Sequence, residues 1–223
     1  MTAQKLTIYT YDWLPEFPRG FVRDMRARWT AEETGRSYDI ATVPVHPKSD
    51  AHRAMQPFAQ VPMIDDGNVT LFETGAITLH LAEGTPLLPP DKRAEITQWV
   101  IAALNSVEPP VGNWMTAQLS KDLPQIFGPP ASAELEAHMH QFMNSRLAAM
   151  ETLMADREWI VGDFSAADII LVDVLRVLPD SGALTDFPAL TDYIARATAR
   201  PAFKKAMQDH MAHWTAADAA RQS

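Results

Sequence analysis

The stretch from Pro57 to Thr74 constrains the fold of this chain more than any other. It holds a short apolar run at 61–64, an Asp66-Gly67 dipeptide and a second β-rich run at 69–72. Asp-Gly between two such runs is typical of a hairpin turn, because glycine adopts a positive φ at little cost. Glu73-Thr74 then opens a run whose apolar residues have helical spacing. The stretch therefore predicts a loop, a β-hairpin and a helix in direct succession.

Pro62 stands at the start of the first hairpin strand. Proline has no N–H to donate to a strand ladder, so the neighbouring backbone is left to bond another partner. The Val61-Pro62 bond is a candidate for the cis form, which about 5% of X–Pro bonds adopt in folded proteins. Glu73 and Thr74 add a carboxylate, a hydroxyl and the unpaired N–H groups of a helix start. Two interpretations follow: a capped helix after a buried hairpin, or a site for a ligand with both an ammonium and a carboxylate.

The composition limits the class of protein. The net charge of -9 argues against nucleic acid as the main partner. The chain has no cysteine, which excludes disulfides, thiolate metal sites and a cysteine nucleophile. No apolar run approaches the ~20 residues of a membrane span, and the amino terminus lacks a basic-then-apolar signal segment. We therefore expect a soluble, cytoplasmic protein with no membrane partner.

The residues before the hairpin alternate between strand and helix patterns. Residues 6–11 and 38–43 are rich in β-formers and predict strands. Between them, apolar residues with helical spacing predict a helix over 19–34 that Gly35 ends. Residues 49–55 predict a short helix. With the hairpin and the following helix, this order predicts a compact α/β unit of about 80 residues.

Several basic residues have helical spacing but complete no known motif. Arg19, Arg23 and Arg26 share one side of the predicted first helix, either as a solvated face or as an anion-attracting wall beside the first strand. His210 and His213 are three residues apart and predict a surface pair. The sequence contains no P-loop, no Rossmann glycine pattern and no zinc-protease motif, and we expect no metal.

From Asp91 the pattern becomes helical. Apolar residues between 96 and 107 follow the spacing of a buried stripe, and Pro109-Pro110 ends or kinks that helix. A loop over 121–130 then precedes a long helix over 132–155. Further helices are predicted to start at Pro188 and Pro201.

The strongest local pattern in the second half surrounds Ser165 and Asp168. These two residues have the N-cap to N3 spacing of a capping box, with aspartate in place of the usual glutamate. Phe164 and Ile169 occupy the positions of a hydrophobic staple. The pattern predicts a helix over 166–178 with a well-defined start, and its role is structural.

In this order and spacing, the segments resemble the cytosolic glutathione transferase family over nearly the whole chain. Residues 56–62 (Gln-Pro-Phe-Ala-Gln-Val-Pro) match the segment before its cis-proline, and Glu73-Thr74 resembles its acidic residue followed by Ser or Thr. Residues 164–168 and 199–203 match features of its helical domain. The resemblance implies an α/β thioredoxin-like domain over 1–84, a linker over 85–91, and an all-α helical-bundle domain over 92–223 that lines the electrophile site.

The resemblance also implies a glutathione site in the first domain. The backbone of Val61, beside Pro62, would pair with the cysteinyl part of glutathione. Glu73 and Thr74 would hold the γ-glutamyl end, with Gln60 close enough to contribute. The implied partners are glutathione as co-substrate, a small apolar electrophile and a second copy of the chain in a homodimer.

The chain departs from the family pattern at the catalytic position. The family activates the glutathione thiol with a Tyr, Ser or Cys just after the first strand, because a hydroxyl donor stabilises the thiolate. The loop over 12–18 contains no Ser, Thr or Cys. Tyr11 is the nearest hydroxyl and Tyr9 the next, on the same side of the strand. Arg19 offers positive charge instead. A packed strand tyrosine and a solvated arginine are the alternative interpretations.

The expected function is a glutathione transferase that conjugates the thiolate to small apolar electrophiles, typical of detoxification. One alternative is a binding or scaffold protein that keeps the fold with little or no transferase activity. Another is a glutathione-dependent peroxidase or isomerase that acts through the glutathione thiolate.

Overall fold

The computed structural model describes residues 5–222 and divides the chain into two compact units. One unit extends through Pro90 and also includes the chain from Thr198 onward, and the other spans Asp91–Ala197. The last helix thus shares a unit with the amino-terminal part of the chain, whereas the sequence pattern groups it with the other helices. None of the helices within 5–222 is both long and apolar enough to cross a membrane.

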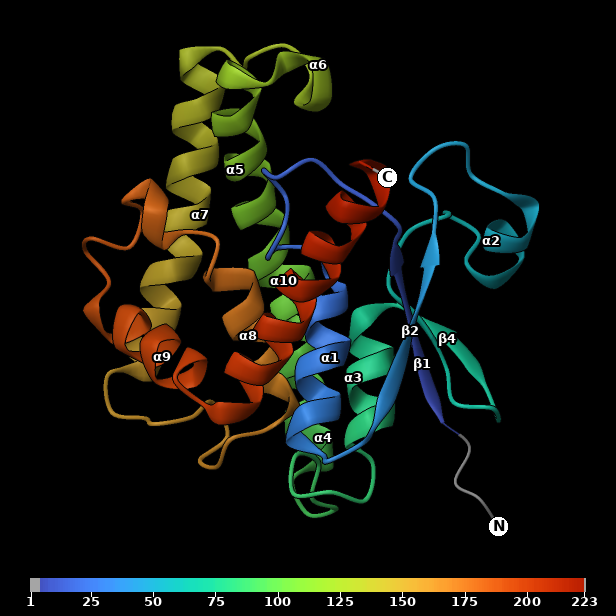
Figure 1. The fold of residues 1–223 in the computed structure, drawn as a ribbon. Helices are drawn as coiled ribbons and strands as arrows, with labels where there is room; N and C mark the ends of the chain where they lie inside the picture. The colour runs from blue at the N-terminus through green and yellow to red at the C-terminus, as the bar shows by residue number, and fades with distance from the viewer. Residues whose placement is uncertain (1–4, 223) are drawn as a thin grey trace. The chain divides into compact units, whose positions relative to one another are not determined.

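The first unit contains a four-stranded sheet in the order β2-β1-β3-β4 (Figure 1). Its strands are β1 (Leu6–Tyr11), β2 (Tyr38–Val43), β3 (Met63–Asp65) and β4 (Thr70–Phe72). β1 and β2 are parallel, and β3 is antiparallel to both β1 and β4. The predicted hairpin is confirmed as β3 and β4, with Gly67 at a φ of 82° in the turn.

The helices of this unit are α1 (Asp24–Glu33), α2 (Asp50–Met55), α3 (Thr74–Ala82) and α10 (Pro201–Gln222). α10 runs beside α1 (Figure 1). The predicted start of the first helix at residue 19 is wrong. Gly20 has a φ of 87°, outside the helical region, and residues 16–23 form turns before α1 begins.

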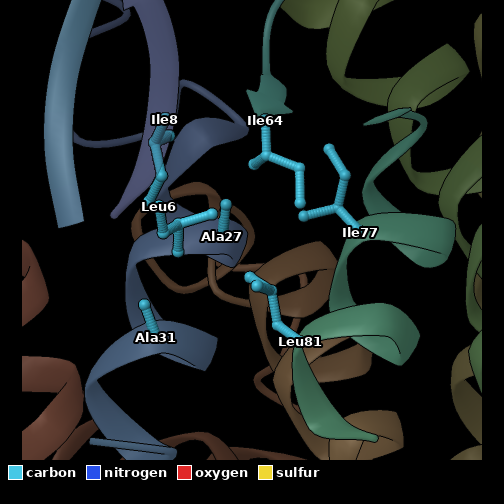
Figure 2. Packing of buried hydrophobic residues seen from close by; sticks show 7 residues of the cluster. All are labelled: Leu6, Ile8, Ala27, Ala31, Ile64, Ile77 and Leu81. Carbon is cyan, nitrogen blue, oxygen red and sulfur yellow. The ribbon is translucent and has the colours of Figure 1, made fainter. Parts of the chain in front are cut away.

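The core of the first unit lies between the sheet and two helices (Figure 2). Leu6 and Ile8 alternate toward the interior along β1, as a strand with one buried face requires. Small side chains on α1 let that helix approach the strand closely. The cluster consists of Leu6, Ile8, Ala27, Ala31, Ile64, Ile77 and Leu81. Each buried Leu or Ile contributes roughly 1.5–3 kcal/mol, so this cluster holds the two central strands, β1 and β3, against α1 and α3.

The second unit is helical. Its elements are α4 (Arg93–Ala102), α5 (Glu108–Asp122), α6 (Pro124–Phe127), α7 (Ala133–Met154), α8 (Ala166–Leu175) and most of α9 (Pro188–Thr198). A π-helical segment, Ala103–Val107, joins α4 to α5, so the helix does not end at Pro109-Pro110; the two prolines lie in the first turn of α5. The short helix α6 lies within the predicted loop at 121–130.

The predicted capping box is confirmed at the start of α8. The Asp168 carboxylate accepts hydrogen bonds from Ser165 N at 2.8 Å, from Ile160 N at 2.9 Å and from the Tyr193 hydroxyl at 2.8 Å. The capping residue therefore also ties α8 to the preceding loop and to α9.

Candidate functional site

Strand pairing gathers several of the predicted site residues at one end of the sheet. Tyr9 pairs with Met63, and Met63 pairs with Phe72. In an antiparallel pair, one step forward on one strand is one step back on the other. Two steps beyond the Tyr9–Met63 pair, Tyr11 at the end of β1 therefore lies at the level of Val61. By the same register, Pro62 lies on the side of Glu73. The sequence-predicted residues on either side of the hairpin therefore meet at this end of the sheet.

The backbone at Val61 has no partner within residues 5–222. The Val61-Pro62 peptide bond is cis, and β3 begins only at Met63. The N–H and the carbonyl of Val61 form no hydrogen bond with the described chain. A free donor and acceptor on one half-buried residue at the end of the sheet can pair with an extended ligand as a strand would.

Two buried side chains form hydrogen bonds with the backbone of Gln60. The Gln60 N–H donates to Gln56 Oε1 at 3.3 Å, and His52 Nε2 lies 3.0 Å from the Gln60 carbonyl oxygen. A carbonyl oxygen only accepts, so His52 carries a proton on Nε2. His52 and Gln56 are buried while the Gln60 side chain is exposed beside Val61. Sequence reasoning missed the supporting role of both residues, although Gln56 begins the segment over 56–62 that resembles the family, because no spacing links either side chain to the Gln60 backbone.

Glu73 and Thr74 form the start of α3. Glu73 is exposed and has a φ of 69°, a conformation that costs a non-glycine residue about 1–3 kcal/mol. Its side chain does not cap the helix, so the carboxylate remains available to a ligand. Thr74 is only 6% exposed, and its hydroxyl accepts a hydrogen bond from Arg26 Nη1 at 3.0 Å.

Arg26 places a buried positive charge beside the start of α3. Its side chain is 2% exposed, so Arg26 belongs neither to a solvated face nor to a surface wall. The guanidinium adds to the positive end of the α3 dipole and to the first N–H groups of that helix. This environment favours a carboxylate, and the neighbouring Glu73 side chain favours an ammonium.

Tyr11 lies at the end of β1 with its side chain half-buried. Lys48 Nζ donates to the Tyr11 hydroxyl at 3.3 Å and lies 4.5 Å from the centre of the ring. The hydroxyl oxygen accepts this bond, so its own proton is left for another acceptor. Sequence reasoning missed Lys48, which lies in a loop between β2 and α2 and gains its place only through folding.

Arg19 is bound to α10. Its Nη1 and Nη2 donate to the two carboxylate oxygens of Asp218 at 2.6 and 2.7 Å. Its Nε and Nη2 also donate to the Leu14 carbonyl at 2.9 and 2.6 Å. The hydrogen bonds from Arg19 and Trp13 lower the pKa of Asp218 to about 2. The Arg19 charge is therefore paired, and the predicted catalytic role of this residue stays a prediction.

The prediction of a surface histidine pair on α10 is wrong. His210 is fully buried, with Nδ1 3.3 Å from Asp24 Oδ2 and Nε2 accepting hydrogen bonds from Trp214 Nε1 and from the Gly20 N–H. His213 is half-buried, and its Nε2 lies 2.9 Å from the Tyr11 carbonyl oxygen. Helical spacing identifies a shared face but not the element that covers it, which is α1 for His210. Within residues 5–222, no three His, Asp or Glu side chains gather into a possible metal site.

The comparisons with known proteins identify the family. The model "Glutathione S-transferase, N-terminal domain" matches residues 18–83, and "Glutathione S-transferase, C-terminal domain" matches residues 117–201. Glutathione S-transferase 3 of Zea mays is 29% identical over 197 residues, which are 81% of this chain and 86% of the relative. The first match begins at residue 18, so it includes Arg19 but not Tyr11.

Solved structures agree with these matches. A glutathione transferase from Burkholderia graminis with two glutathione molecules bound per subunit is 25% identical, covers 92% of this chain and 88% of its own, and superposes with a TM-score of 0.74. A family member from Pseudomonas fluorescens, 21% identical over 93% of this chain and 94% of its own, has the same fold with a TM-score of 0.77. The predicted thioredoxin-like domain followed by an all-helical domain is thus confirmed. The chain therefore belongs, as an enzyme, to the cytosolic glutathione transferase family.

Proposed function

We propose that this enzyme binds glutathione at the sheet end formed by Tyr11, Val61 and Glu73 and conjugates its sulfur to small apolar electrophiles. The observation that carries the proposal is the unpaired backbone of Val61 next to the open start of α3. The γ-glutamyl ammonium and carboxylate and the cysteinyl backbone groups of glutathione each have a complementary group there.

The binding mode follows from that complementarity. The γ-glutamyl ammonium pairs with the exposed Glu73 carboxylate, and the γ-glutamyl carboxylate binds the Thr74 hydroxyl and the first N–H groups of α3. The cysteinyl N–H and carbonyl pair with Val61, which Pro62 keeps outside the β3 ladder. The exposed Gln60 amide lies next along the chain and adds a polar contact. The buried guanidinium of Arg26 strengthens the site for an anion without contacting it.

Thiol activation is assigned to Tyr11, with Lys48 in support. Lys48 donates to the Tyr11 oxygen, so the phenol proton can point to the glutathione sulfur. A hydroxyl donor and a nearby positive charge both favour the thiolate, which lowers the pKa of the thiol. The thiol proton passes to solvent. The sulfur electron pair then forms the C–S bond, and the leaving group departs with the electron pair of its own bond.

The experiment is a pH titration of the thiolate absorbance of bound glutathione, followed by conjugation assays against a panel of electrophiles. We expect a bound-thiol pKa below that of free glutathione and measurable turnover. Tyr11→Phe should raise the bound-thiol pKa and lower kcat, while Tyr9→Phe, the same change on the same side of β1, should do neither. Binding with an unshifted thiol pKa and no turnover would exclude the transferase proposal.

A further inference from the structure

Within residues 5–222, the Tyr11 backbone has no strand partner on the β3 side. The Asp12 N–H donates to the Val43 carbonyl at 3.0 Å, so even-numbered residues of β1 turn their backbone groups toward β2. Backbone groups of adjacent residues point in opposite directions, so those of Tyr11 face the β3 side. β3 starts at Met63, which pairs with Tyr9. The Tyr11 carbonyl therefore extends beyond the ladder.

His213 of α10 satisfies this carbonyl. Its Nε2 lies 2.9 Å from the Tyr11 oxygen, and since a carbonyl only accepts, the Nε2 proton must be present. Burial lowers the pKa of His213, while the hydrogen bond to Tyr11 opposes that shift. The ring also packs edge-on against Trp214, with 4.6 Å between ring centroids. The orientation of the His213 ring is therefore fixed by both the hydrogen bond to Tyr11 and the ring contact with Trp214.

Asp218, less than two turns further along α10, holds the loop after Tyr11. It accepts hydrogen bonds from Trp13 Nε1 at 2.8 Å and from both terminal nitrogens of Arg19. Arg19 in turn binds the Leu14 carbonyl. The Arg19 guanidinium also lies 5.8 Å from the Trp13 ring centroid. An ion pair, several hydrogen bonds and a cation–ring contact therefore all hold the loop that follows Tyr11.

α10 itself is anchored by buried residues before these two contacts. His210 accepts hydrogen bonds from the Gly20 N–H and contacts Asp24, which forms an ion pair with Arg28 at 2.7 Å. Asp24 and Arg28 are both on α1 and both buried. Because this network fixes the helix, His213 and Asp218 approach the loop from a rigid support.

We propose that α10 is a positioning element for catalysis, in which His213 fixes the Tyr11 carbonyl and Asp218 fixes the loop over 12–19. This inference rests on the proposed function, because it acts through the Tyr11 hydroxyl. The proposed glutathione contacts lie at 60–62 and 73–74, and α10 forms no hydrogen bond with these residues within the described range 5–222. Loss of the His213 contact should therefore affect thiol activation and not glutathione affinity.

The test uses the full-length protein with three histidine variants. His213→Phe keeps a planar ring and removes the donor, His213→Gln keeps an N–H donor, and His138→Phe makes the same change at an exposed position in the other unit. For His213→Phe we expect kcat to fall about five- to tenfold and the bound-thiol pKa to rise, with the glutathione Kd within about twofold of wild type. His213→Gln should recover most of kcat, and His138→Phe should match wild type.

Each other outcome overturns the inference. An unchanged kcat and bound-thiol pKa in His213→Phe removes His213 from the mechanism, while the Tyr11→Phe result still decides the proposed function. Equal losses of stability and glutathione affinity in both His213 variants indicate a purely structural role. A wild-type protein that neither lowers the thiol pKa nor turns over refutes the proposed function, and this inference with it, before any variant is made.

Discussion

The Thr74 hydroxyl should be worth a measurable part of both stability and glutathione affinity. It is buried and accepts a hydrogen bond from the buried Arg26 guanidinium at 3.0 Å. Thr74→Val preserves the shape of the side chain and replaces this acceptor with a methyl group. Because a hydrogen bond to a charged group contributes about 1.5–3 kcal/mol, we expect the free energy of unfolding to fall by that amount. Urea unfolding of the ligand-free protein measures it.

The same substitution should weaken glutathione binding. The hydroxyl is proposed to donate to the γ-glutamyl carboxylate, and a lost contact of about 1.4 kcal/mol corresponds to a tenfold higher Kd. Isothermal titration calorimetry measures the Kd at a temperature where both proteins are folded. Thr74→Ser is the matched control, since it keeps the hydroxyl and removes only the methyl group.

Two results would refute this reasoning. If Thr74→Val binds glutathione with the Kd of Thr74→Ser, the hydroxyl does not contact the ligand. If Thr74→Val unfolds at the same urea concentration as wild type, the Arg26 contact does not stabilise the folded state. The first result bears on the ligand and the second on the fold, so the two are separable.

Three further predictions concern pH, the helical unit and assembly. Burial opposes the shift, but hydrogen bonds from His80 and two backbone N–H groups hold the pKa of Asp66 below its usual value. The stability that this pair contributes is therefore present above about pH 4 and is lost as the pH falls through the folded-state pKa. Asp66→Asn should remove that part of the pH dependence of urea unfolding, and an unchanged dependence at acid pH would contradict it. Asp168→Ala should lower the free energy of unfolding by about 3–5 kcal/mol, because it leaves several buried donors unpaired, and a loss below about 1 kcal/mol would show that water replaces the carboxylate. The homodimer that the family implies predicts sedimentation faster than that of a 24.8 kDa species, and finding only that species would contradict it.

Much of the fold could be predicted because its determinants are local. The strands over 6–11 and 38–43 have the bounds that their β-rich composition indicates. The Asp66-Gly67 turn and the capping box at Ser165 involve residues no more than a few positions apart, and each satisfies its backbone groups on its own. The wrong prediction for the start of α1 also depends on a local feature. The apolar spacing favoured a start at residue 19, but Gly20 adopts a left-handed conformation that is incompatible with the helix.

The residues of the candidate site likewise fall into those that local sequence could indicate and those that only folding brings together. Val61, Pro62, Glu73 and Thr74 could be proposed from the sequence because they flank one hairpin, whose register brings them to one end of the sheet. Lys48, His52 and Arg26 could not, because each reaches the site from a separate element. No spacing in the chain distinguishes Lys48 and His52 from ordinary surface residues, and the helical spacing of Arg26 does not indicate that this side chain is buried beside Thr74.

The sequence by itself determined the local elements and the hairpin, and its resemblance to the family supplied the residues proposed to hold glutathione. Only the tertiary structure decided the surroundings of Tyr11, where the family pattern fails. His213 is 202 positions away from Tyr11 in the chain, and Asp218 is 199 positions from Arg19. Contacts at such separations depend on how α10 packs against α1, which local periodicity does not encode. The physical reason is that a helix pattern specifies which residues share a face, while packing alone specifies what that face meets.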